Sequence, residues 1–220
     1  MKADVIKTLA ESPMFFGISE EDISAVCENT SPVIKSYLKG EMVINQGDIL
    51  HHIGIVLKGK LADIKYHDDG SSQLLRLINP RELIGLESIS SSVALSSGSI
   101  EANVRSTILF FNYDSILSAE MVSDKCKLMI LKNISTLLAN EYIESQNMAD
   151  ILSNFTIRSL VISFLEYQSE QNKSNSFDIG MNQTQLAHYL RVNRSVLSKE
   201  LNQMRREGII DFEGSRYMLL

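Results

Sequence analysis

Apolar residues at helical spacing near the end of the chain predict two consecutive helices. The first begins after Asn182, which can cap it, and Gln185 three residues later can complete a capping box. A turn over residues 191–193 follows, and Asn193 is suited to cap a second helix over residues 194 to about 207. One stripe along the second helix indicates the face that it buries: Leu197, Leu201 and Met204.

The polar residues of the second helix collect beside that stripe and predict a nucleic-acid contact. Arg, Lys and Asn donate to base edges in a major groove, and Ser suits bases or phosphates. Gly208 can end the helix, and residues 209–212 and 216–219 predict a hairpin about Glu213-Gly214. Helix, turn, helix and hairpin in this order predict a winged helix-turn-helix. The residues expected at the DNA are Gln183, Thr184, Asn193, Arg194, Ser195, Val196, Ser198, Lys199 and Asn202.

The stretch QLAHYLRVNRSVLSKELNQMRREGII resembles the DNA-binding signature of the CRP/FNR family of bacterial transcription regulators. The resemblance implies that bases are contacted from the start of the second helix, by Arg194, Ser195, Ser198 and Lys199. Ser195 stands where many members have glutamate, and Lys199 where arginine is usual, so well-known operators should not be transferred. Arg158 matches an arginine common in the family. The implied partners are double-stranded DNA with a roughly palindromic operator, a second copy of the chain and, as a further candidate, RNA polymerase.

Between residues 33 and 113 the apolar pattern changes and predicts short β-strands. Turn glycines separate the expected strands: residues 33–37, 42–44, 53–57, 60–66, 73–77 and 104–111. The stretches KGEMVINQGD, IGIVLKGKL and DDGSSQLL resemble a cyclic-nucleotide-binding β-roll, with a cupin-like barrel without a regulatory role as the alternative. The expected fold is α+β: N-terminal helices with a jelly-roll type β-roll effector domain (1–113), a long dimerisation helix and hinge (114–152) and a winged helix-turn-helix (153–220).

The expected effector pocket departs from the motif that binds cyclic nucleotides in this kind of β-roll. The family motif implies Gly-Glu-Leu for the ribose and Arg with Ser or Thr for the phosphate. Here Leu86 takes the place of the glutamate, and Ile100 and Glu101 fall where Arg and Ser or Thr are expected. The anionic side chain of Glu101 at this pair of positions disfavours a phosphate by several kcal/mol at ~4 Å and an effective dielectric constant of about 20. We therefore expect neither cyclic AMP nor cyclic GMP in the pocket, which is assigned to Ile84, Gly85, Leu86, Glu87, Ser99, Ile100 and Glu101.

Other sensor groups also lack their usual residues. An iron–sulfur cluster of the family type needs several cysteines near the N-terminus, and only Cys27 lies in that half. His51 and His52 would point to opposite faces of a strand, which disfavours haem or another metal site there. No cofactor is therefore expected, and an unidentified small molecule or anion, a redox-sensitive Cys126 or no effector at all stay open.

The long helical segment, residues 114–152, carries two apolar stripes. The first has heptad-like spacing and consists of Ile130, Ile134, Leu137, Met148 and Ile151. The residues assigned to the dimer contact of this helix are Ile130, Ile134, Leu137, Glu141 and Met148. The second stripe consists of Leu131, Leu138 and Tyr142. One stripe can pack on the β-roll while the other meets a second copy, so we expect a homodimer that presents two recognition helices one DNA turn apart.

Composition and charge limit the remaining classes of protein. The net charge of the 220 residues is −6, yet residues 191–206 hold five basic side chains and one acid, which places positive charge at the expected DNA face. No run of about 18 apolar residues exists, and the N-terminus does not resemble a secretory signal, so we expect a cytoplasmic protein without membrane contact. The four histidines form no catalytic set, so no enzyme is expected. The alternatives are a β-barrel ligand-binding protein whose C-terminal domain makes protein contacts, and a cyclic-nucleotide-responsive regulator.

Overall fold

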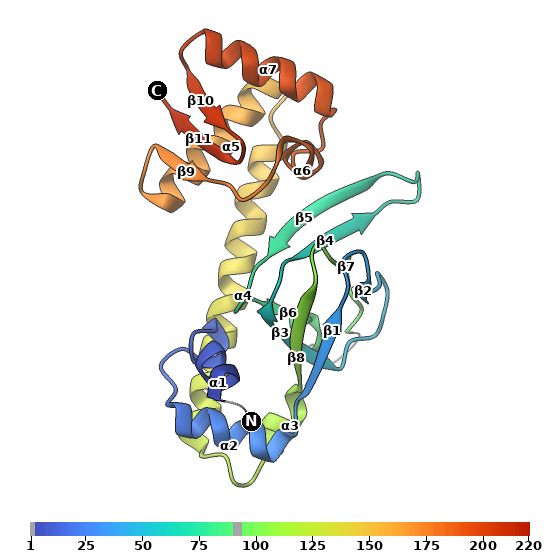
Figure 1. The fold of residues 1–220 in the computed structure, drawn as a ribbon, viewed down its shortest axis with the longest axis vertical. Helices are drawn as coiled ribbons and strands as arrows, with labels where there is room; N and C mark the ends of the chain where they lie inside the picture. The colour runs from blue at the N-terminus through green and yellow to red at the C-terminus, as the bar shows by residue number, and fades with distance from the viewer. Residues whose placement is uncertain (1–2, 90–93) are drawn as a thin grey trace. The chain divides into compact units, whose positions relative to one another are not determined.

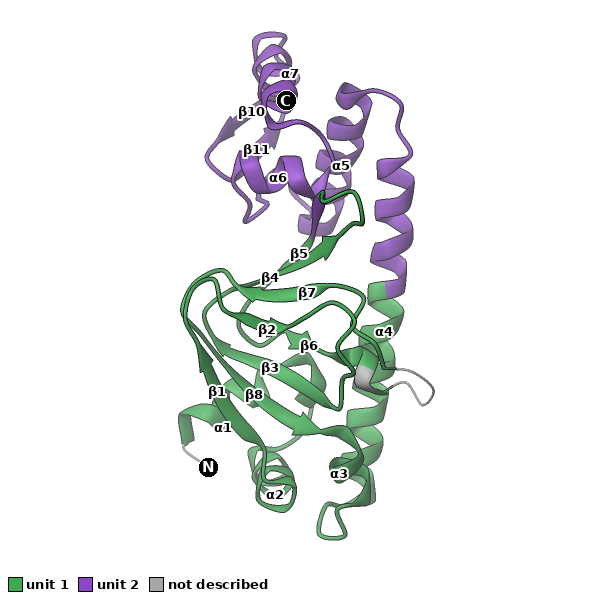
Figure 2. Cartoon of the chain, turned by 90° about the vertical axis from the view of Figure 1, so that its right-hand side faces the viewer, with its two compact units in different colours: residues 1–71, 75–141 green, residues 72–74, 142–220 purple. Residues whose placement is uncertain are grey.

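The computed structural model describes residues 3–89 and 94–220, which divide into two compact units (Figure 2). The first unit holds residues 1–71 and 75–141, and the second holds residues 72–74 and 142–220. The division falls within the long helix α4 (Asp124–Leu152), between Glu141 and Tyr142. None of the described helices has the length and apolar character needed to cross a lipid bilayer.

Two four-stranded sheets form the expected β-roll of the first unit, with strand orders β1-β8-β3-β6 and β2-β7-β4-β5 (Figure 1). Antiparallel pairing of β3 with β8 forms the centre of the first sheet, and β7 pairs antiparallel with both β2 and β4 in the second. The strands are β1 (Val33–Tyr37), β2 (Met42–Ile44), β3 (His52–Lys58), β4 (Leu61–Tyr66), β5 (Ser72–Ile78), β6 (Leu83–Ile84), β7 (Ser99–Ala102) and β8 (Ser106–Asn112).

Strands β6 and β7 were not expected from the sequence. β6 has two residues, too few for any alternation of apolar and polar positions to be recognised. β7 mixes polar and apolar residues after a serine-rich stretch, and its pairing with β2 and β4 is what makes it a strand. Both elements depend on tertiary pairing rather than on local propensity.

Strands β3 and β8 are buried on both faces of their sheet, whereas the edge strand β1 is mostly exposed. Ile108 packs between the two sheets, while the next residue, Leu109, packs on the other side against helices, because successive strand residues point in opposite directions. The cluster between the sheets, called the inter-sheet cluster below, is aliphatic: Ile44, Leu50, Val56, Leu61, Ile78, Ile84, Ile100, Ala102 and Ile108. The cluster on the other side, called the helix-facing cluster, includes Phe15, Ile23, Phe111, Ile116 and Ile130.

Helices from both ends of the first unit cover the helix-facing cluster: α1 (Ala3–Ala10), η1 (Pro13–Phe15), α2 (Glu20–Thr30), α3 (Tyr113–Ser118) and the first part of α4. Ser19 caps α2 by accepting a hydrogen bond from the backbone N–H of Asp22. The helical segment expected without a break over residues 114–152 is interrupted after α3. Ser123 starts the new helix by accepting from the N–H of Cys126 at 3.2 Å.

The second unit contains three helices after the end of α4 and a small sheet of order β10-β11-β9. A capping box between Thr156 and Ser159 starts α5, whose apolar face is buried. The elements are α5 (Ile157–Asn172), β9 (Ser176–Asp178), α6 (Gln183–Tyr189), α7 (Arg194–Arg206), β10 (Ile210–Glu213) and β11 (Arg216–Leu219). This order confirms the expected winged helix-turn-helix, with the β10–β11 hairpin as the wing.

Candidate nucleic-acid interface

The turn between α6 and α7 is fixed by hydrogen bonds that the sequence predicted in part. Asn182 and Gln185 form the expected capping box at the start of α6. The chain then bends through Arg191, which has a left-handed backbone (φ 56), and the N–H of Val192 donates to the carbonyl of Ala187 at 2.9 Å. Asn193 caps α7 through a bond from the N–H of Ser195 at 2.9 Å, which confirms its expected role.

One face of α7 is fully buried, and this fixes which face remains outside. Leu197, Leu201 and Met204 have no exposed surface and form the expected stripe. On the remaining surface Arg194, Lys199 and other polar residues are exposed. Of the nine residues expected at DNA, seven are exposed, and Gln183 and Ser198 are half-buried: the exposed ones are Thr184, Asn193, Arg194, Ser195, Val196, Lys199 and Asn202. The structure thus presents the residues of the two helices together on accessible surface.

Three of these polar side chains, Asn193, Ser195 and Asn202, already have partners within the chain. The hydroxyl of Ser195 donates to the capping oxygen of Asn193 at 2.7 Å. The side-chain amide of Asn202 donates to the carbonyl of Ser198, one turn earlier, at 2.7 Å. Arg194 and Lys199 therefore carry the long cationic side chains of this surface, at the amino-terminal half of the helix, where the helix dipole also favours phosphate.

Arg158, in the first turn of α5, binds α7 through two carboxylates. Its Nε donates to the Glu200 carboxylate at 2.6 Å, and Nη1 and Nη2 donate to the Glu207 carboxylate at 2.6 and 3.1 Å. The hydrogen bonds to Glu207 and Glu200 raise the pKa of Arg158, and the bond from Arg158 lowers the pKa of Glu207. The one acid among residues 191–206, Glu200, is thus paired with a cation that lies 42 residues away in the sequence.

Arg205 was counted from the sequence among the positive charges at the DNA face, but in the structure it is paired within the chain. It forms an ion pair with Asp211 of β10 at 2.7 Å, and its guanidinium lies 5.4 Å from the centre of the Phe212 ring. This arginine therefore connects α7 to the wing, and its charge is offset locally. Phe212 in turn stacks on Tyr217 of β11, so the wing is packed against the end of the recognition helix.

The residues assigned to an effector pocket do not lie together: some belong to the inter-sheet cluster, one to the helix-facing cluster, and others have polar or exposed surroundings. Ile84 and Ile100 are buried in the aliphatic inter-sheet cluster, whereas Leu86 belongs to the helix-facing cluster. Glu87 is exposed, and the buried hydroxyl of Ser99 accepts from the N–H of Gln46 at 2.9 Å. The interior of the roll at these positions is therefore apolar.

Glu101 does not face the interior of the roll, so, contrary to the expectation from the sequence, it does not repel a phosphate there. Ile100 and Ala102 both pack in the inter-sheet cluster, and Glu101 lies between them on β7, so its side chain projects from the opposite face. What replaces the expected arginine on the inner face is the hydrocarbon side chain of Ile100. Gly85 has a left-handed backbone (φ 73), and a Cβ there would lie 2.6 Å from the carbonyl oxygen of His52, so its role is conformational.

Two family models match the chain in the regions that carry these features. A model described as the cyclic nucleotide-binding domain matches residues 34–120, and one described as the Crp-like helix-turn-helix domain matches residues 160–220. The chain belongs to the CRP/FNR family. It is a DNA-binding transcription regulator by this membership, with the two domains in the order that the family has.

Characterised CRP/FNR regulators are similar to most of the chain. The transcriptional activator protein Anr of Pseudomonas aeruginosa is 24% identical over 188 residues, which are 83% of this chain and 74% of that protein. The regulatory protein HlyX of Actinobacillus pleuropneumoniae is 22% identical over 207 residues, 90% of this chain and 82% of that protein.

Solved structures of CRP/FNR proteins have the same fold. FixK2 from Bradyrhizobium japonicum matches with a TM-score of 0.65 and 18% identity, over 86% of this chain and 92% of that one. The global regulator CLP of Xanthomonas campestris, described as responsive to c-di-GMP, matches with a TM-score of 0.69 and 15% identity, over 91% of this chain and 99% of that one.

In this CRP/FNR chain the two stripes of α4 have different surroundings. Ile130 and Ile134 are buried in the helix-facing cluster, and Leu137 packs against it, so the assignment of these three residues to a dimer contact is corrected. Glu141 bonds to Arg76 of β5, and Met148 is half-buried in the second unit. The other stripe is exposed: Leu131 by 37%, Leu138 by 42% and Tyr142 by 66%. Leu128, which precedes Leu131 by three positions and was not part of the expected stripe, is also exposed, by 68%.

Both cysteines of the chain are free thiols in apolar surroundings. Cys27 and Cys126 lie in the helix-facing cluster. Burial raises the pKa of Cys27 to about 11 and also raises the pKa of Cys126. Since the thiolate is the form that binds metals and reacts with oxidants, neither cysteine has the surroundings of a reactive thiol. Within residues 3–89 and 94–220, no three His, Cys, Asp or Glu side chains are arranged to hold a metal ion.

Proposed function

We propose that this regulator acts in the cytoplasm as a homodimer that binds a two-fold symmetric DNA site through α7 of each copy. The observation that carries this proposal is the exposed polar surface at the start of α7, with Arg194 and Lys199 outward and the apolar face fully buried. A helix held at both its cap and its far end can enter a major groove as a rigid body. This role needs no catalytic residue, and we assign none.

The exposed stripe of α4 is the surface we assign to the second copy. The exposed stripe follows a heptad spacing over Leu128, Leu131, Leu138 and Tyr142, and Ser135 occupies the heptad position between Leu131 and Leu138. Such a repeat of exposed leucines on a long helix is typical of a two-stranded coiled-coil contact. A dimer of this kind would present two recognition helices to one operator.

We further propose that cyclic AMP and cyclic GMP do not control this protein. The support comes from Ile100, whose buried side chain occupies the inner face where the family motif implies an arginine, and from Leu86, which is buried in the helix-facing cluster where the motif implies a glutamate. An apolar surface offers a phosphate no compensation for the water that it loses. Calorimetric titration with both nucleotides tests this, since micromolar binding would contradict it.

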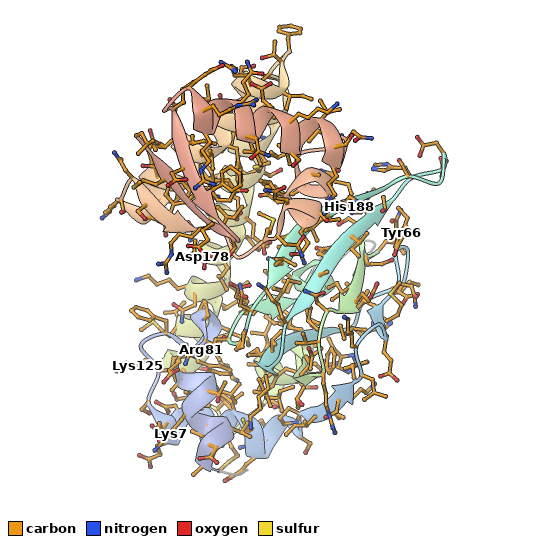
Figure 3. The ribbon with its side chains drawn as sticks, turned by 45° about the horizontal axis from the view of Figure 1, so that its top comes forward. Lys7, Tyr66, Arg81, Lys125, Asp178 and His188 are labelled. Atoms are coloured by element: carbon orange, nitrogen blue, oxygen red, sulfur yellow. The ribbon has the colours of Figure 1, made fainter. Side chains whose placement is uncertain are left out.

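The base-reading assignment can be tested with single substitutions after the operator has been recovered by selecting genomic fragments that bind the purified protein. Arg194→Ala and Lys199→Ala should each weaken operator binding by about 1–3 kcal/mol if these side chains contact bases. Lys125→Ala is a matched control, because Lys125 is an exposed cation in the first turn of α4 and should leave the affinity unchanged (Figure 3). Unchanged footprints and affinities in both α7 variants would defeat the assignment.

Salt dependence separates DNA binding from the alternative in which the C-terminal domain makes only protein contacts. Each phosphate contact contributes about −0.9 to the slope of log affinity against log salt, so a DNA-binding module shows a steep decrease. A variant that loses a phosphate contact should reduce this slope by about one, whereas a variant that loses a base contact should mainly reduce sequence discrimination. Retention on DNA that does not change with salt would contradict the proposed role.

A further inference from the structure

A charged group connects the β-roll to α4 in the first unit. Arg76 of β5 donates from Nη1 to Glu141 of α4 at 2.9 Å, and its Nε lies 3.8 Å from Oδ2 of Asp63 on β4. Its Nη2 also donates to the carbonyl oxygen of Leu83 at 3.4 Å. One arginine is therefore placed between two carboxylates, with good hydrogen-bond geometry to Glu141 and a longer contact to Asp63.

Asp63 is the least solvated member of this group. Its side chain is 17% exposed, against 36% for Arg76 and 39% for Glu141. Its Oδ1 is buried and has no hydrogen-bond partner in the described part of the chain. The backbone of Gly98 closes over it, since a Cβ at that glycine would lie 2.5 Å from Oδ1. A buried carboxylate oxygen without a donor favours the neutral acid.

The charges around Asp63 come from four elements and leave its charged form poorly compensated. Burial raises the pKa of Asp63 to about 6; Arg76 of β5 and Lys65 of β4 oppose the shift, while Glu87 of η2 (Leu86–Ile89) and Glu141 of α4 add to it. Asp63 therefore takes up its proton at a pH just below neutral. When it is neutral, it no longer competes with Glu141 for the guanidinium of Arg76.

We propose that Asp63, Arg76 and Glu141 form a proton-sensitive link between the β-roll and α4. On acidification Asp63 becomes neutral, Arg76 pairs with Glu141 alone, and the strength of the contact between the β-roll and α4 changes. This inference rests on the DNA-binding role proposed above, because α4 carries the proposed dimer surface and its last part belongs to the second unit. The proton is the effector: it binds the carboxylate of Asp63, and no bond other than this O–H is formed. The device requires no ligand in the apolar interior of the roll.

The test measures operator affinity by fluorescence anisotropy with the full-length protein between about pH 5 and pH 8 at constant salt. The wild type should change its affinity about fivefold or more, with a midpoint near the pKa of Asp63, which is about 6. Asp63→Asn mimics the neutral acid, so its affinity should be independent of pH and equal to the low-pH value of the wild type. Glu141→Gln should also abolish the change, because the carboxylate that receives Arg76 is absent.

Two controls exclude other titrating groups. Asp69→Asn alters an exposed acid that follows β4 in the same hairpin and should keep the wild-type profile. His188→Gln removes an exposed imidazole of α6 and should also keep it (Figure 3). The same pH profile in the wild type and in Asp63→Asn would overturn the inference.

A second readout does not depend on DNA. The protection of the α4 amides near Glu141, measured by hydrogen exchange relative to the intrinsic rate at each pH, should change over the same pH interval in the wild type and stay constant in Asp63→Asn. If the wild type binds no DNA at any pH, the proposed function fails, and this readout still decides the link. Exchange that is identical in the two proteins at every pH would overturn it.

Discussion

Replacing Asp63 by asparagine should remove a specific pH dependence from the free energy of unfolding. Burial raises the pKa of Asp63 from 3.8 to about 6 in the folded protein, and in the unfolded chain the carboxyl returns to its ordinary value. Between these two pKa values the folded state keeps a proton that the unfolded state has released. The contribution of Asp63 to the free energy of unfolding is therefore fully present below about pH 4 and is lost as the pH rises through about 6. Two pKa units at about 1.4 kcal/mol each set this loss at about 3 kcal/mol.

The measurement is urea unfolding followed by circular dichroism between about pH 4 and pH 8. The free energy of unfolding of Asp63→Asn minus that of the wild type should rise by about 3 kcal/mol over this interval. Asp69→Asn is the matched control, because hydrogen bonds from Ser71 lower the pKa of Asp69, and its contribution is lost as the pH falls, the opposite sign. A difference for Asp63→Asn that stays constant to within about 0.5 kcal/mol would refute the reasoning from burial.

Three further substitutions test other parts of the structure. Leu138→Glu should convert the proposed dimer to a monomer in analytical ultracentrifugation, because it places a charge in the exposed apolar stripe, whereas Asn140→Glu on the exposed surface outside the stripe should not. Arg158→Ala should weaken operator binding with little change in helix content, since it removes the cation that pairs with Glu200 and Glu207; equal affinity in both proteins would show that α7 is positioned without it. Gly85→Ala should lower the stability by about 1–3 kcal/mol in thermal denaturation, because its Cβ would meet the His52 carbonyl oxygen at 2.6 Å; unchanged stability would contradict the strain.

The winged helix-turn-helix could be predicted almost completely because its determinants are local. The cap residues Asn182 and Asn193 act within three positions of themselves, and the stripe that begins at Leu197 repeats with the period of a helix. Local hydrogen bonds and a single periodicity decide such elements before any distant contact forms. The six strands with clear alternation were found for the same reason.

The features that the sequence left undecided depend on which distant residues meet. Two stripes on α4 had equivalent patterns, and only the packing of Ile130 and Ile134 against the roll shows which one is left exposed. Glu101 was placed in the pocket by alignment, but the pairing of β7 turns it to the outer face.

The charged contacts have the same dependence on tertiary structure. The partners of Arg158 and the sharing of Arg76 between two carboxylates join residues up to 65 positions apart in the sequence. The sequence by itself determined the helical and strand periods, the caps and the family. The tertiary structure decided which faces are buried and which charges are paired, because burial and ion pairing are properties of the assembled surface and not of any one segment.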